Sequence, residues 1–200
     1  MIRFSSSKEE QFWRWFSKNS KKILHFDKDQ NNLFHNLKLR LDKIDPNLVF
    51  EFSPILKDGT REFIISADGV KSSFTSVINL VKSAPYLTDW KITAFRQPHF
   101  EITQISYETL TVRFDDVFFR YVCAEGKMSL DLFIRNFYES AEWTSLSFIL
   151  LDTILGEYKT EMYLGSINKH ILKNSVMYDD LIPISELPKI LDSCILLWNN

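Results

Sequence analysis

Residues 61–98 read REFIISADGVKSSFTSVINLVKSAPYLTDWKITAFRQP, and this stretch decides the fold. Its first part, residues 61–67, alternates β-branched and aromatic side chains with polar ones, which predicts a strand. The pair Asp68-Gly69 breaks that strand, because glycine adopts a positive φ at no steric cost. The stretch therefore begins as a strand that ends in a tight turn.

A helix and a second strand complete the stretch. Apolar residues recur at about 3.6-residue spacing over residues 70–81, which predicts a helix with one apolar face. Pro85 stops this helix, because its ring cannot continue the helical backbone. Residues 90–94 alternate again, and Pro98 ends that strand because proline lacks the ladder donor.

A hairpin precedes this unit. Residues 48–54 alternate as a strand, and Lys-Asp-Gly-Thr at residues 57–60 joins them to the strand at residue 61. An Asp-Gly pair between two alternating runs is a strong hairpin signal. Residues 48–98 therefore predict a unit of hairpin, helix and strand.

The same order of elements recurs later in the chain. Residues 117–123 and 128–135 predict a second hairpin around a Glu-Gly-Lys turn. Residues 139–155 predict a helix with apolar residues on two sides, and residues 158–167 alternate as a strand. Residues 117–167 thus form a second candidate unit, which is either a true duplication or a chance reuse of a common α+β element.

The predicted fold is a single α+β domain over residues 1–200. Its mainly antiparallel sheet comes from the two hairpin–helix–strand units, which either share one sheet or form two facing lobes. A helical hairpin at residues 7–45 and a C-terminal helix from Ser185 flank the sheet. Residues 101–106 and 109–114 predict one or two further short strands.

Charge is unevenly distributed along the chain. The net charge of −2 argues against a dedicated nucleic-acid-binding protein. Residues 1–43, however, hold ten Lys and Arg against five Asp and Glu, whereas the remainder holds fourteen against twenty-one. The basic helices are either an ordinary solvated surface or an electrostatic docking face.

Cysteine use and hydropathy predict a location. Cys123 and Cys194 belong to no CxxC motif and no Cys/His cluster, so we expect no zinc site and a reducing cytoplasm. Cys194 lies on the apolar side of the C-terminal helix, which favours a buried thiol over a nucleophile. No run of about 18 apolar residues occurs, so we expect no membrane span.

One tryptophan in the first helix is a candidate for partner binding. Phe12, Phe16 and Ile23 form the apolar stripe of that helix, and Trp13 and Trp15 lie on opposite flanks of the stripe. The two indoles therefore cannot both face one core, and we expect Trp15 to be partly exposed. A helical Trp is more often a packing residue than a binding residue.

Asp68, Arg96 and His99 are the best polar cluster that the sequence offers. Asp68 follows one strand of the first unit, whereas Arg96 and His99 follow another. If these strand ends are neighbours, a carboxylate, a guanidinium and an imidazole converge on one rim that binds a ligand or supplies acid–base chemistry. The alternative is a structural ion pair.

The remaining motifs indicate no activity. The four histidines do not show HxxxH or HxH spacing, and no phosphate-binding glycine motif or GxSxG occurs. We therefore expect no metal and no cofactor.

The favoured function is a non-catalytic module that binds a protein or a small ligand, with no nucleic acid and no membrane among its partners. The alternative is a small hydrolase or transferase that uses the Asp68, Arg96 and His99 rim. The sequence leaves the oligomeric state open.

Four stretches resemble an uncharacterised family of bacterial proteins: REFIISADG, APYLTDWKITAFRQP, LLDTILGEY and LIPISELP. The similar order in that family is Glu-Phe-x-Ile-Ser-Ala-x-Gly, then Ala-Pro-x-Leu-x-x-Trp, then Ala-Phe-Arg. The resemblance covers about residues 44–190 and implies a bacterial origin and an α+β fold. It implies no activity and no functional residues.

Overall fold

The computed structural model describes residues 6–26, 29–173 and 180–198, and the chain divides into two compact units. The first unit is Met1–Arg96 and the second is Gln97–Asn200. Both units combine helices with a sheet, which confirms the predicted α+β class. The prediction that residues 1–200 form a single domain stays a prediction.

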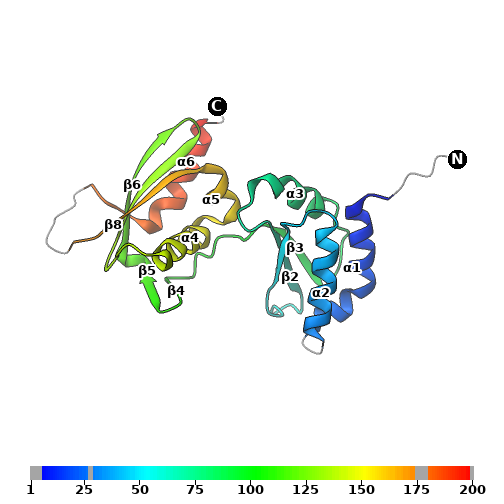
Figure 1. Ribbon diagram of the computed structural model, residues 1–200. Coiled ribbons are helices and arrows are strands. Elements are labelled where there is room, and N and C mark those ends of the chain that lie inside the picture. The colour runs from blue at the N-terminus through cyan, green and yellow to red at the C-terminus, as the bar shows by residue number, and fades with distance from the viewer. Residues whose placement is uncertain (1–5, 27–28, 174–179, 199–200) are drawn as a thin grey trace. The chain divides into compact units, whose positions relative to one another are not determined.

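The first unit carries a helical hairpin and a sheet of strand order β1-β2-β3 (Figure 1). Its elements are α1 (Lys8–Leu24), α2 (Gln30–Asp42), β1 (Val49–Phe52), β2 (Arg61–Ser66), a 3₁₀ turn (Lys71–Ser73), α3 (Phe74–Lys82) and β3 (Trp90–Ala94). β1 pairs antiparallel with β2, whereas β3 pairs parallel with β2.

Aromatic side chains from the helices and the sheet form the core of the first unit. The ring of Phe63 on β2 stacks on that of Phe16 on α1, with the centroids 4.9 Å apart. Phe34 on α2 packs against Phe50 on β1, with the centroids 5.2 Å apart. Both hairpin helices therefore contribute aromatic rings to the same apolar face of the sheet.

The second unit contains two sheets, a two-stranded β4-β5 and a four-stranded β8-β7-β6-β9. Its strands are β4 (Gln104–Tyr107), β5 (Leu110–Arg113), β6 (Val117–Ala124), β7 (Lys127–Ile134), β8 (Leu164–Ile171) and β9 (Ile182–Pro183). Its helices are α4 (Ala141–Leu155), α5 (Glu157–Tyr163) and α6 (Leu187–Trp198), with 3₁₀ turns at Phe114–Asp116 and Ile184–Glu186. β7 pairs antiparallel with β6 and parallel with β8.

The four-stranded sheet has one covered and one open face. Every second residue of β7, from Met128 to Ile134, is buried in a cluster that includes Leu150 of α4 and Leu191 of α6. The intervening residues of β7 are only partly buried. The period-two alternation of the strand therefore produces an apolar face under the helices and a polar face opposite it.

Each unit repeats the predicted order of hairpin, helix and strand. In both units the second strand of the hairpin pairs in parallel with the strand that follows the helical segment: β2 with β3, and β7 with β8. The strands of the two units belong to separate sheets, which answers the question of a shared sheet for the described residues. Duplication of an ancestral unit stays a prediction.

One predicted strand boundary is wrong. Residues 158–167 were expected to be a strand, but the chain first forms α5 and enters β8 only at Leu164. Gly156, with φ of 78°, separates α4 from α5. Within α5 the buried residues are Glu157 and Thr160, three positions apart, which is the spacing of one helical face. A short period-two pattern did not distinguish this helix from a strand.

Candidate functional site

The structure joins two of the three predicted rim residues. Asp68 and Gly69 both have positive φ, at 51° and 78°, so the predicted turn after β2 is confirmed. Arg96 Nη1 lies 3.0 Å from Asp68 Oδ1, and Arg96 Nε lies 2.5 Å from Glu51 Oε1. The guanidinium therefore ties β1 and the turn after β2 to the end of β3, which favours the structural ion pair.

His99 belongs to the second unit, whereas Asp68 and Arg96 belong to the first. Its backbone N–H donates a hydrogen bond to Thr153 O at 2.8 Å. The enzymatic alternative requires all three side chains at one reacting centre. The ion pairs of Asp68 and Arg96 described above lie within the first unit, and the enzymatic alternative stays a prediction.

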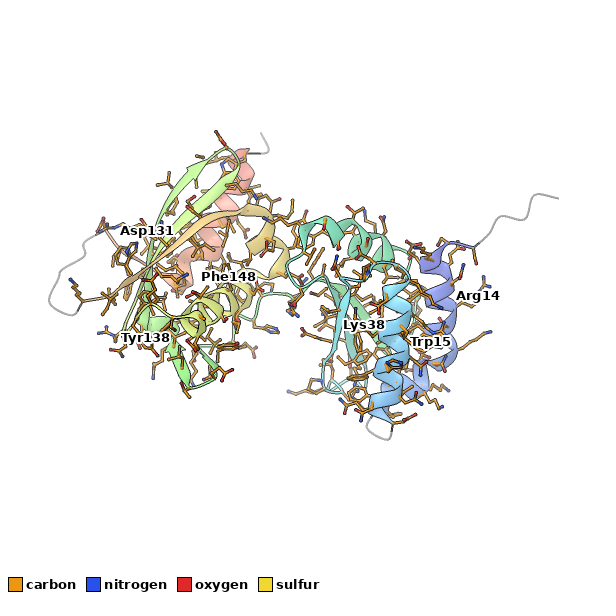
Figure 2. The ribbon with its side chains drawn as sticks, in the orientation of Figure 1. Arg14, Trp15, Lys38, Asp131, Tyr138 and Phe148 are labelled. Atoms are coloured by element: carbon orange, nitrogen blue, oxygen red, sulfur yellow. The ribbon has the colours of Figure 1, made fainter. Side chains whose placement is uncertain are left out.

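Trp15 is partly exposed, as predicted. Figure 2 labels Trp15 on α1. The guanidinium of Arg40 on α2 lies over its indole, 4.4 Å from the centroid. Trp13, on the opposite flank, is buried and donates its Nε1–H to Leu80 O at 2.7 Å. Trp15 therefore contributes to a cationic surface across α1 and α2 through a cation–π contact.

A groove with three cationic side chains lies between α1 and α2. Its volume is about 380 Å³, and we call it the basic groove; it is lined by Lys8, Gln11, Phe12, Arg40 and Lys43. Lys8 begins α1 and Lys43 follows the last turn of α2, so the groove lies where the start of one helix meets the end of the other. This placement concentrates positive charge at one end of the hairpin.

One polar atom of the groove is unsatisfied. Arg40 Nε is buried and has no hydrogen-bond partner within the described ranges. A buried N–H without a partner is costly, and an oxygen ligand that reached it would relieve this cost. The same guanidinium is held over Trp15, which restricts its side-chain conformations.

Other charges of the hairpin limit which cations face a ligand. Lys38 is already used, because its Nζ lies 2.5 Å from Asp42 Oδ1 and donates to two backbone carbonyls. Glu10, in the first turn of α1, is held by the capping box with Ser7. Glu9 in the same turn reduces the local positive charge. The cations that face a ligand in the basic groove are therefore Lys8, Arg40 and Lys43.

A second polar cluster lies on the open face of the four-stranded sheet. Asp131 Oδ1 accepts a hydrogen bond from Asn168 Nδ2 at 2.9 Å and lies 3.4 Å from His170 Nε2. Arg120, opposite Asp131 on β6, lies over the ring of Phe133 at 5.1 Å. The hydrogen bond from Asn168, followed by His170, lowers the pKa of Asp131 below its ordinary value of 3.8.

This lowered pKa predicts a small pH dependence of stability. A carboxyl with a lower pKa in the folded state stabilises the fold above its unfolded pKa, and this stabilisation is lost as pH falls through the folded pKa. Asp131→Asn should therefore flatten the decline of the free energy of unfolding below about pH 4, by less than about 1 kcal/mol, because the half-exposed side chain is screened. Urea denaturation at a series of pH values measures this.

The control for this prediction is Asp115→Asn. Asp115 has a side chain that is 89% exposed, and the chemical change is identical. It should leave the pH profile of the wild-type protein in place. Equal slopes in the wild type and Asp131→Asn would contradict the prediction.

Comparisons with protein-family models, with curated proteins and with solved structures found no match. In the described part of the chain, no group of three or more His, Cys, Asp and Glu residues could hold a metal ion. No helix among those residues is long and apolar enough to cross a membrane.

Sequence reasoning missed the groove and found only its charge. The excess of Lys and Arg in residues 1–43 marked the hairpin as basic. Arg40 was not singled out, because its contact with Trp15 joins residues 25 positions apart on different helices.

Proposed function

We propose that this protein is a non-catalytic binding module whose basic groove takes an acidic segment of a partner protein. The observation that carries the proposal is the Arg40 guanidinium, held over Trp15 with its Nε buried and unsatisfied. Lys8 and Lys43 lie beside it in the groove. A carboxylate at this point would accept a charge-assisted hydrogen bond and face two further cations.

Charge and residue type favour a protein over a nucleic acid. The basic groove is local, and residues outside the first 43 carry an excess of acidic side chains that would repel a long polyanion. Trp and Arg are the residue types most enriched among the energetic anchors of protein interfaces. Trp15 and Arg40 supply one of each, already in contact.

We further propose a bacterial cytoplasm as the setting. The bacterial assignment rests on the resemblance of residues 44–190, and the cytoplasmic one rests on the absence of CxxC and Cys/His motifs. The function needs no metal and no cofactor. Its specificity would come from the position of carboxylates on the partner relative to Arg40.

Reversing one charge of the basic groove tests the proposal. Lys43 is exposed, so Lys43→Glu should weaken binding of an acidic partner about tenfold at low salt without loss of folding. Fluorescence anisotropy with a labelled polyglutamate peptide measures the affinity. Affinity-purified partners from a native lysate, identified by mass spectrometry, then show which proteins depend on Lys43.

Lys57→Glu is the matched control. Lys57 is also exposed in the first unit, but it lies in the loop between β1 and β2 and does not line the groove. The control should keep wild-type binding. Equal weakening by both variants would indicate a general charge effect and contradict the proposal, as would peptide binding that does not change in Lys43→Glu.

A further inference from the structure

Two thiols that are far apart in the sequence meet in the second unit. Cys123 Sγ and Cys194 Sγ lie 3.0 Å apart, although 71 positions separate the residues. Cys123 lies near the end of β6, and Cys194 lies on α6. A disulfide has its sulfurs about 2.05 Å apart, so these two sulfurs would need to approach by only about 1 Å to form one.

The covered face of the sheet explains the meeting. Side chains at every second position of a strand lie on the same face of the sheet. Phe119, Tyr121 and Cys123 therefore share one face of β6, the face on which Phe119 is buried. α6 packs on that face through Leu191, and Cys194 follows one helical turn later. The helix register therefore brings one thiol above the other.

We propose that Cys123 and Cys194 form a reversible disulfide by exchange with low-molecular-weight disulfides of the glutathione class. Both sulfurs are within reach of such a molecule, because Cys123 is exposed and Cys194 is partly exposed. The bond fastens α6 to the end of the β6–β7 hairpin. It is a modification site of the second unit and does not depend on the proposed binding function of the first.

The exchange balances in two steps. The Cys123 thiolate attacks one sulfur of oxidised glutathione, that disulfide breaks, and one glutathione leaves as a thiolate that takes up the proton. The Cys194 thiolate then attacks the Cys123 sulfur of the mixed disulfide and expels the second glutathione. Two protein thiols are oxidised, and one small disulfide is reduced to two thiols.

The fraction of thiol that is ionised sets the rate of the exchange. Cys123 is exposed as a residue, but partial desolvation of its sulfur, followed by the contact with Cys194, raises the pKa of Cys123 to about 12 from its usual 9.0. At neutral pH the Cys123 thiol is therefore almost entirely protonated. Because only the thiolate attacks, exchange is slow, and the pair serves sustained oxidation better than brief exposure.

Incubation of the full chain with oxidised glutathione tests the proposal. We expect both thiols to become unreactive to maleimide, no bound glutathione at completion, and an intact mass lower by two hydrogen atoms. The melting temperature should rise by about 5–10 °C, because the bond closes a long loop, and dithiothreitol should reverse every change. Cys194→Ser should stop at the mixed disulfide on Cys123, since the second thiol is missing.

A variant with a displaced thiol is the matched control. Val122→Cys combined with Cys123→Ser keeps two thiols but moves one to the opposite face of β6, where Val122 is 68% exposed. It should retain glutathione and gain no stability. Two thiols that stay free in the oxidised wild type, a persistent glutathione adduct on it, a disulfide between chains, or equal closure in the displaced variant would each overturn the proposal.

Discussion

Phe63→Ala should lower the free energy of unfolding of the first unit by about 3–5 kcal/mol, the range for removal of a buried aromatic side chain. Phe63 has no exposed surface and lies at the centre of β2. Six aromatic rings lie within 6.4 Å of its own ring, those of Phe12, Trp13, Phe16, Phe50, Phe52 and Trp90. Since these rings come from α1, β1 and β3, no single element can close the cavity.

Urea denaturation gives the size of this loss, and hydrogen exchange with mass spectrometry gives its location. Amides of β1, β2 and β3 should lose protection from hydrogen exchange first, because the variant leaves a cavity in the core that these strands share. Phe100→Ala is the control, since Phe100 is 76% exposed, and its effect should stay within about 0.5 kcal/mol. Similar losses in the two variants would show that Phe63 does not hold this core.

Leu132→Ala should destabilise the second unit by about 2–5 kcal/mol. Leu132 is fully buried on β7, between Phe119 of β6 and Lys169 of β8 in the strand register. Its side chain belongs to the cluster formed by the sheet with α4 and α6. Truncation leaves a cavity beneath both helices, and the surrounding side chains can fill it only in part.

Val122→Ala is the matched control on the open face of the same sheet. It also shortens an aliphatic side chain in a strand, but Val122 is 68% exposed, so its effect should stay within about 0.5 kcal/mol. Thermal unfolding followed by far-ultraviolet circular dichroism compares the two variants. If Val122→Ala cost as much as Leu132→Ala, the assignment of the two sheet faces would be wrong.

Local signals predicted much of this fold. The Asp-Gly turn after β2 and the alternation of β7 depend on neighbouring residues only, and both are confirmed. The prediction of a strand over residues 158–163 was wrong, because six residues of mixed polarity fit a strand and a short helix equally well. There, burial against the rest of the unit selects the helix, and sequence pattern alone does not contain that information.

Contacts between distant residues explain what was missed at the candidate sites. Trp15 was correctly expected to be partly exposed, but the charge over its ring comes from Arg40 on the next helix. Cys194 was expected to be a buried thiol, yet it is only partly buried, with Cys123 beside it. The pairing of Asp68 with Arg96 depended on strand direction, which no local pattern supplies.

The position of β8 has a consequence for self-association. It is the outermost strand of its sheet in the described part of the chain, so one of its edges is a template for strand addition by a second molecule. Lys169 lies in this strand, and a charged side chain at such an edge opposes the stacking of copies into fibrils. We therefore expect apolar substitutions at this edge to promote aggregation of the protein at high concentration.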